Sequence, residues 1–297
     1  MNRRIYLASV ASAVTLSAGC LGDETTDDGD GSITAWANGT LEFGLPPFQD
    51  AEELERQYSG LFEWLEAGFE DLAVTGVPTT DYSGVIESVV QGHTEMANLS
   101  PLIYVMAADE GITPLAVNEL HGESSYHAYI STRTDTDIES LEELAGRTVA
   151  MVDPLSTSGG LFPLQLLTDA GLDVGDAHTE PTDLDIEWSF GHDNAVAALE
   201  NGHVDAAAYG DFQHPDDDEI VKIAESDPIP LAAAVTAPET PDDITAALTD
   251  RLLETPESAL EEHMVTGFGP YDSDDYDLVS EIATRFGVTV SDLDAAE

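Results

Sequence analysis

The stretch RTVAMVDPLSTSGGLFPLQLLTDAG, residues 147–171, joins an apolar run, a polar turn and a second apolar run in direct succession. The apolar run Arg147–Val152 has the content of a buried strand. A turn of hydroxyl residues and glycines follows, Ser156-Thr157-Ser158-Gly159-Gly160. Leu161–Ala170 then has helical character and stops at Gly171, a residue typical of helix C-termini. The stretch therefore predicts a strand, a loop and a helix, the repeating unit of α/β folds.

The turn itself has the composition of an anion-binding loop. Backbone N–H groups at a helix start are unpaired and the helix dipole is positive there, while hydroxyls add donors and glycine allows close approach. Such a loop can hold a phosphate-like oxyanion without a basic side chain. The alternative is an ordinary N-cap, in which one hydroxyl caps the helix and the others face solvent. The turn has neither the Gly-Lys-Ser/Thr ending of a P-loop nor the G-x-S-x-G pattern of a hydrolase elbow.

Outward from this stretch, strand and helix patterns alternate, which predicts an α/β fold with mostly parallel sheets. The expected helices include Asp50–Gly68, Tyr82–Gly92, Pro101–Asp109 and Asp193–Asn201. The expected strands include Thr40–Gly44, Asp71–Val77, Met96–Leu99, Tyr126–Thr132, Val204–Tyr209 and a crossing strand at Pro228–Ala237. From about Pro241 the remainder is expected to be helical.

The chain is extremely acidic. Its 297 residues contain 60 acidic and 8 basic side chains, and the formal net charge is −52. Such a charge argues against nucleic acid as a partner, because phosphates would be repelled. A hydrophobic content of 42% indicates a globular core rather than a disordered polymer. We expect a halophilic protein, since concentrated salt screens a carboxylate-covered surface.

The N-terminus resembles an export signal. Arg3-Arg4 precedes the short apolar stretch Ile5–Leu16, too short to span a membrane. The arginine pair resembles a twin-arginine signal, and the small residues before Cys20 resemble a lipoprotein cleavage site, although Ser17 stands where leucine is more usual. We expect a signal peptide at 1–19, lipidation of Cys20 and an acidic tether at 20–33. Cys20 is the only cysteine, so no intrachain disulfide can form.

Four segments, in order, resemble the PhnD-like substrate-binding proteins of ABC transporters for phosphate, phosphite and phosphonate. The segment DPLSTSGGLFP resembles the family's ligand loop, and SLEELAGRTVAMVDP the strand before it. DYSGVIESVVQGHTEMANLSPLIYVMA resembles its first-lobe signature, and GHDNAVAALENGHVDAAA a helix–strand unit of its second lobe. Together with the N-terminus, these segments suggest a haloarchaeal-type lipoprotein of this family.

The resemblance implies a two-lobe periplasmic-binding-protein fold of type II, whose lobes are joined by two crossing strands and close on a ligand. Lobe one would comprise residues 34–131 and 233–297, and lobe two residues 132–232. The function implied is that of a receptor, and not an enzyme, which delivers a phosphorus oxyanion to an ABC permease. We expect a monomer without cofactor or metal, exported and lipid-anchored at the outer face of the cytoplasmic membrane.

Carried over by position, the resemblance assigns Tyr82 and Tyr104 of lobe one to the ligand. From lobe two it assigns Ser156, Thr157, Ser158 and His192. The alternative is a purely structural role, in which the two tyrosines pack at a lobe edge and His192 is a core or capping residue.

Departures from the family pattern bear on the ligand. Asp211 keeps one carboxylate near the expected cleft, but Ala232 lies close to where a second carboxylate is expected for an amino-alkyl ligand. An ammonium group would therefore be poorly paired. The sequence favours phosphate, phosphite or a simple alkylphosphonate over 2-aminoethylphosphonate.

Three other interpretations remain open. A secreted hydrolase of phosphate or ester groups would use Ser, His and Asp residues, and a receptor of the same fold would bind another small anion or a pyrimidine-like precursor. A metal site would draw on His121, His127 or His192, but no H-x-x-x-H or H-E-x-x-H pair exists. The acidic run His214–Glu219 lacks the spacing of a calcium loop.

Overall fold

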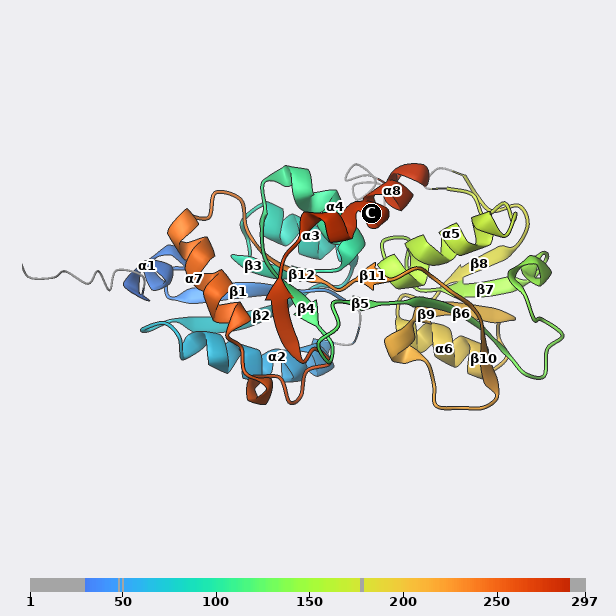
Figure 1. Cartoon of the computed structure of the whole chain (residues 1–297), viewed down its shortest axis with the longest axis horizontal. Coiled ribbons are helices and arrows are strands. Elements are labelled where there is room, and N and C mark those ends of the chain that lie inside the picture. Colours follow the sequence, from blue (N-terminus) through green and yellow to red (C-terminus); the bar gives the residue numbers. More distant parts are fainter. Residues whose placement is uncertain (1–29, 48, 50, 177–178, 289–297) are drawn as a thin grey trace, which may run out of the picture.

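Two mixed β-sheets, each covered by helices, lie next to each other along the long axis of the molecule (Figure 1). This computed structural model describes residues 30–47, 49, 51–176 and 179–288. The predicted signal peptide and Cys20 lie outside the described residues. Within them, no helix combines the length and the apolar character that crossing a membrane requires.

The larger lobe is built on a six-stranded sheet of order β13-β4-β12-β3-β1-β2. Its strands are β1 (Thr40–Leu45), β2 (Ala73–Pro78), β3 (Met96–Leu99), β4 (Thr113–Glu119), β12 (Ala233–Thr236) and β13 (Gly267–Pro270). Its helices are α1 (Asp30–Trp36), α2 (Ala51–Glu66), α3 (Tyr82–Val90), α4 (Pro101–Ala107) and α7 (Asp242–Leu253). Residues 30–33, assigned to the tether from sequence, thus begin α1, and Ile33 is fully buried.

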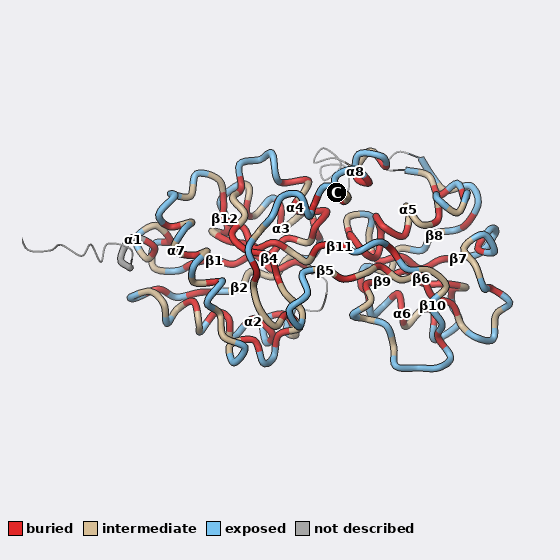
Figure 2. Tube along the Cα trace, in the orientation of Figure 1, coloured by how far each residue is buried: buried red, intermediate tan, exposed pale blue. Residues whose placement is uncertain are grey.

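The smaller lobe is built on a five-stranded sheet of order β10-β6-β9-β7-β8. Its strands are β6 (Ala128–Arg133), β7 (Thr148–Met151), β8 (Asp185–Trp188), β9 (Ala206–Gly210) and β10 (Ile220–Glu225). Its helices are α5 (Phe162–Asp169) and α6 (His192–Glu200). Buried residues run along the strands of both sheets, while exposed residues lie mostly on the outer faces of the helices and in the loops (Figure 2).

The chain crosses between the lobes on two adjacent segments. β5 (Ser125–Tyr126) follows β4, and β11 (Ile229–Pro230) follows β10; the two pair antiparallel as a two-stranded ribbon between the sheets (Figure 1). After the second crossing β12 enters the larger sheet between β3 and β4 and runs antiparallel to both. The expectation of two crossing strands is thereby met.

Two details of the predicted secondary structure are wrong. The sheets are mixed rather than mostly parallel. The reason is that a strand arriving across the ribbon enters its sheet in the opposite direction. β12 in the larger lobe and β6 in the smaller lobe therefore each have antiparallel neighbours. The region after Pro241 is not wholly helical, because β13 adds an edge strand to β4. The helix α8 (Asp277–Arg285) follows it and lies near the junction of the lobes (Figure 1).

Candidate functional site

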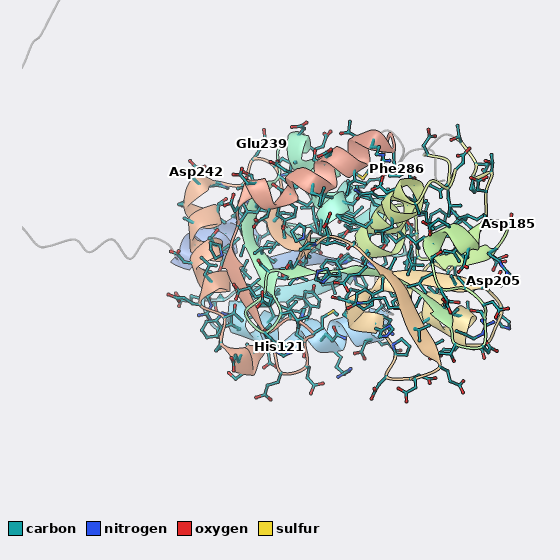
Figure 3. The ribbon with its side chains drawn as sticks, turned by 45° about the vertical axis from the view of Figure 1, so that its right-hand side comes forward. His121, Asp185, Asp205, Glu239, Asp242 and Phe286 are labelled. Carbon is teal, nitrogen blue, oxygen red and sulfur yellow. The ribbon has the colours of Figure 1, made fainter. Side chains whose placement is uncertain are left out.

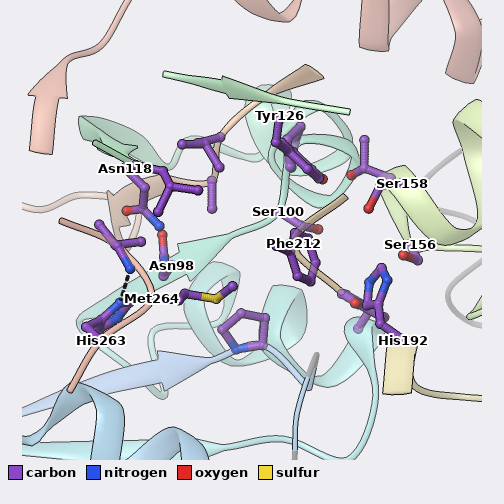
Figure 4. Close-up of a pocket in the computed structure, with 18 of the residues that line it drawn as sticks. Asn98, Ser100, Asn118, Tyr126, Ser156, Ser158, His192, Phe212, His263 and Met264 are labelled. Atoms are coloured by element: carbon purple, nitrogen blue, oxygen red, sulfur yellow. Dashed lines mark hydrogen bonds between the residues drawn. The ribbon is translucent and has the colours of Figure 1, made fainter. Parts of the chain in front are cut away.

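A pocket of about 100 Å³ lies between the lobes (Figure 4). Such a volume holds a small ligand only, since it is several times the space needed by one water molecule and well below that of a drug-sized site. Side chains of both lobes and of the crossing ribbon line it: Pro46, Tyr58, Tyr82, Asn98, Ser100, Pro101, Asn118, Leu120, Tyr126, Ser156, Thr157, Ser158, His192, Phe212, Leu231, Ala232, His263, Met264 and Val265. Lys, Arg, Asp and Glu are missing from this lining, which is drawn from the described residues.

The predicted ligand loop forms one wall of the pocket. Ser156 caps the following helical turn, because its Oγ accepts a hydrogen bond from the Gly159 backbone N–H at 3.1 Å. The turn, Thr157–Leu161, is a single π-helical turn that continues into α5. Ser156 thus caps the helix as the N-cap interpretation expects, but Thr157 and Ser158 do not face solvent, because both are buried and line the pocket.

Glycine is required in this loop by close packing. A Cβ at Gly159 would lie 2.1 Å from Cγ2 of Val152, and a Cβ at Gly160 would lie 2.2 Å from the Asp153 carbonyl oxygen. The Gly159 carbonyl also accepts a hydrogen bond from the Val152 N–H at 2.8 Å. These contacts fold the loop back onto the end of β7 and hold the hydroxyls of residues 156–158 at the pocket.

Thr157 joins the two lobes directly. Its Oγ1 accepts a hydrogen bond from the backbone N–H of Leu102 at 2.9 Å, in the first turn of α4. The usual capping position, Ser100, makes no side-chain cap on that helix. A hydroxyl of the smaller lobe therefore caps a helix of the larger lobe across the pocket.

Besides α4, three helices present their first turns to the pocket. Tyr82 is the first residue of α3, whose N-cap Asp81 accepts from the Gly84 N–H at 2.8 Å. His192 is the first residue of α6, and the loop of residues 156–158 leads into α5. Because helix N-termini carry partial positive charge, this arrangement favours an anion in the pocket.

His192 supplies a neutral donor. It is 3% exposed, and burial lowers its pKa to about 4, so the imidazole is uncharged at neutral pH. Its Nδ1 accepts a hydrogen bond from the Gly210 N–H at 3.1 Å, which places the ring proton on Nε2. The family resemblance assigns His192 to the ligand, and the structure places this residue in the pocket wall.

The phenols of the pocket are Tyr82 and Tyr126, together with Tyr58 at the opposite end. Burial raises the pKa of both Tyr82 and Tyr126, so both hydroxyls remain protonated. The Tyr82 hydroxyl interacts with Ser156, and that of Tyr126 with Ser158 and Thr157. Tyr126 is not among the residues expected from sequence, because the pattern of the strand Tyr126–Thr132 does not show that its first side chain reaches the loop.

Two residues selected from sequence do not line the pocket. The hydroxyl of Tyr104 lies 2.6 Å from that of Tyr271, and its ring packs against Tyr271 and Tyr276. The Asp211 carboxylate accepts from the backbone N–H of His127 at 3.0 Å and lies 3.5 Å from its imidazole Nδ1. The structure therefore brings together Tyr82, the three hydroxyl residues of the loop and His192, and leaves Tyr104 and Asp211 outside.

The few described basic side chains are engaged elsewhere. Four form ion pairs with carboxylates: Arg56 with Glu53 and Glu262, Arg147 with Asp205, Lys222 with Glu225, and Arg285 with Asp169. Arg133 donates to two backbone carbonyls besides Asp135, and Arg251 stacks on Trp64. Acids lie at both ends of the molecule, Asp185 and Asp205 on the smaller lobe and Glu239 and Asp242 on the larger (Figure 3).

The pocket lining therefore offers hydroxyls and a neutral imidazole, while the described lysine and arginine side chains lie elsewhere. In the part of the chain that the structure describes, no cluster of three or more His, Cys, Asp or Glu is placed to hold a metal ion.

Comparisons with known proteins agree with this architecture. Residues 43–276 match the family described as ABC transporter, phosphonate, periplasmic substrate-binding protein. The chain is 31% identical over 173 residues to the phosphate-import protein PhnD of Mycolicibacterium smegmatis, which covers 56% of the chain and 54% of the relative. The match thus spans about half the length of that curated relative.

Solved structures show the same fold. The PhnD1 protein of Prochlorococcus marinus, in complex with methylphosphonate, superposes with a TM-score of 0.73 at 16% identity, over 84% of this chain and 98% of that one. A binding protein component of an ABC phosphonate transporter from Pseudomonas aeruginosa gives a TM-score of 0.71 at 19% identity, over 84% and 86%. The predicted two-lobe α/β fold is confirmed.

The family consists of transport receptors and not of enzymes, so the hydrolase interpretation is set aside. Family membership also implies export from the cytoplasm. The chain belongs to the family of periplasmic substrate-binding proteins of phosphonate ABC transporters.

Proposed function

We propose that this protein captures a phosphorus oxyanion in the pocket between its lobes and presents it to an ABC permease. The observation that carries the proposal is the chemistry of the pocket wall at the loop of residues 156–158. Neutral donors from three helix starts converge there, and no carboxylate lines the wall to repel an anion. Phosphate, phosphite and simple phosphonates present the oxygen atoms that such donors bind.

The end of the ligand away from the phosphorus carries no positive charge in this proposal. An ammonium group needs a carboxylate partner, and the described lining contains none. The relatives agree with this class of ligand, since one is named for phosphate import and another was solved with methylphosphonate. We therefore rank 2-aminoethylphosphonate below phosphate, phosphite and uncharged alkylphosphonates.

Calorimetric titration tests the proposal. Phosphate, phosphite and methylphosphonate are titrated into the protein in molar KCl. Ser158→Ala and Tyr126→Phe should each weaken binding of the preferred anion about ten- to a hundredfold, because a hydrogen bond to a charged group is worth about 1.5–3 kcal/mol. Tyr104→Phe serves as the control, since its hydroxyl bonds to Tyr271 outside the pocket. The proposal fails if none of the three anions binds.

We also propose that the protein is a halophilic lipoprotein that works as a monomer. The twin-arginine-like start and the small residues before Cys20 support the lipoprotein assignment, and the net charge of −52 supports the halophilic one. Such an anchor would hold the receptor at the outer face of the cytoplasmic membrane, beside its permease. Cys20→Ala should release the protein from the membrane fraction into the medium; retention of that variant in the membrane would contradict lipid anchoring.

A further inference from the structure

The pocket has a second polar end, opposite the loop of residues 156–158. Figure 4 shows Asn98, Asn118 and His263 at one end and Ser156, Ser158 and His192 at the other. Asn98 lies on β3 and Asn118 on β4, the two neighbours of β12 in the larger sheet. This second end, formed by Asn98, Asn118 and His263, belongs to the larger lobe.

Sheet register places the two asparagines on one face. Asn98 is paired with Ala234 of β12, and Ala234 is paired with Ala116, two residues before Asn118. Cross-strand partners and residues two apart point to the same side of a sheet. That side faces α2, where the Tyr58 hydroxyl accepts a hydrogen bond from Nδ2 of Asn98 at 2.7 Å. The Tyr58 ring in turn packs against the ring of His263, with centroids 4.4 Å apart.

Polar atoms at this end lack partners within the protein. The side chains of Asn98 and Asn118 are 4% exposed and that of His263 is 8% exposed. Even so, Oδ1 of both asparagines and Nε2 of His263 make no hydrogen bond. Buried polar atoms are nearly always paired, and each exception calls for an explanation. Since all three residues line the pocket, a ligand is the natural partner.

The free atoms include both acceptors and a donor. His263 Nδ1 accepts from the Val265 N–H at 2.9 Å, so its proton is on Nε2. Burial lowers the pKa of His263 to about 4, which keeps the ring neutral. The bond from Asn98 Nδ2 to Tyr58 orients the amide so that its free atom is the oxygen, an acceptor.

The group that fits both an acceptor and a donor is an uncharged hydroxyl, which gives one hydrogen bond and accepts others. A carboxylate on the ligand would lack a cation here, and an ammonium group would lack a carboxylate, because the described lining is uncharged. Between the two ends lie the apolar side chains of Phe212 and Met264 and the hydroxyl of Ser100, which also makes no hydrogen bond within the protein (Figure 4).

We propose that the second end binds a terminal hydroxyl of the ligand, so that the ligand class is the hydroxyalkylphosphonates. The phosphonate group lies at the loop of residues 156–158, the short alkyl chain lies against Phe212 and Met264, and the hydroxyl lies at Asn98, Asn118 and His263. This inference rests on the proposed function, because it assigns the phosphorus group to the same loop.

Titration of the unaltered full chain with four ligands tests it: 2-hydroxyethylphosphonate, propylphosphonate, 2-aminoethylphosphonate and methylphosphonate. Propylphosphonate replaces the hydroxyl by a methyl of similar size. We expect 2-hydroxyethylphosphonate to bind at least tenfold more tightly than propylphosphonate and 2-aminoethylphosphonate. Equal or weaker binding of the hydroxyl compound overturns the inference while the proposed function stands. Failure of all four to bind overturns the proposed function as well.

A variant pair locates the effect. Asn118→Leu keeps the approximate size of the side chain and removes the free acceptor. The variant should prefer 2-hydroxyethylphosphonate over propylphosphonate by less than threefold. Its affinity for methylphosphonate should stay within twofold of that of the unaltered protein. Ser158→Ala, at the other end, should weaken all three ligands together and keep the preference. If a folded Asn118→Leu variant kept the full preference, the assignment of the ligand hydroxyl to the second end would be contradicted. If that variant does not fold, the ligand series on the unaltered protein decides whether the second end binds a hydroxyl.

Discussion

At the scale of single residues, burial leaves this pocket with uncharged hydrogen-bond donors rather than positive charges. His192 and His263 are both buried, and burial lowers the pKa of each to about 4. Both rings are therefore neutral and have an N–H free to donate, in a chain whose described lysine and arginine side chains are engaged outside the pocket.

The lowered pKa values predict acid sensitivity of the fold. In the unfolded chain a histidine titrates near 6.5, so between about pH 6.5 and pH 4 the unfolded state binds protons that the folded state does not. Stability is complete above that window and is lost as pH falls through it. Each histidine should lower the free energy of unfolding by about 2 kcal/mol between pH 7.5 and pH 5.

Denaturant unfolding at the two pH values in constant molar KCl checks this. His192→Gln should reduce the loss on acidification, whereas His203→Gln, at an exposed position, should not change it. An equal loss in all three proteins would show that His192 is not the group responsible.

The choice between Tyr104 and Tyr126 shows the limit of sequence reasoning at this scale. Motif spacing places a tyrosine near the cleft but does not say what its hydroxyl contacts. Tyr104 turns to Tyr271, which is 167 residues away in the chain. Tyr126 reaches the loop because β5 pairs with β11 in the crossing ribbon. Both outcomes depend on long-range packing that no local pattern carries.

At the scale of elements, the lobes are joined by more than the ribbon. Thr157 caps α4 across the pocket, and Arg285 of α8 pairs with Asp169 of α5 at 2.8 Å. The exposed ion pair contributes little, because solvent screens it. The buried hydrogen bond contributes more, because without it the Leu102 N–H would be left without a partner.

Thr157→Val tests this contact, since valine keeps the shape and removes the acceptor. The variant should lose about 1–3 kcal/mol of unfolding free energy in the absence of ligand. Thr157→Ser retains the hydroxyl and should lose less than half as much. Chemical denaturation measures both; a valine variant as stable as the unaltered protein would show that the cap does not hold the lobes together.

Elements with a clear local pattern were predictable, and an element without one was not. The helix expected at Tyr82–Gly92 is α3, because its apolar residues recur at helical spacing, and the strand expected at Met96–Leu99 is β3. The strand Gly267–Pro270 was missed because it contains two glycines and a proline. It exists as an edge strand because β4 offers it a partner.

At the scale of the whole molecule, the fold and family followed from four motifs in order, whereas the second end of the pocket did not. Asn98, Asn118 and His263 come from two strands and a loop far apart in the sequence. Asn98 lies within the segment that resembles the first-lobe signature, but Asn118 and His263 lie outside all four segments. Only the assembled larger lobe brings the three residues to one pocket.

The net charge of −52 predicts that folding depends on salt. Repulsion among surface carboxylates destabilises the compact state at low ionic strength, and 1 M salt shortens the Debye length to about 3 Å. The melting temperature, followed by circular dichroism, should rise steadily between 0.2 and 3 M KCl. A melting temperature that is constant or falls over this range would contradict the halophilic assignment.

The central claim is that neutral donors at the ends of helices hold a phosphorus oxyanion between the two lobes. A crystal structure of the protein grown with methylphosphonate in molar KCl tests it most directly. The account predicts phosphonate oxygens within hydrogen-bond distance of the Ser156, Thr157 and Ser158 hydroxyls and of His192 Nε2. A structure with the ligand bound elsewhere, or with this pocket empty at saturating ligand, would contradict it.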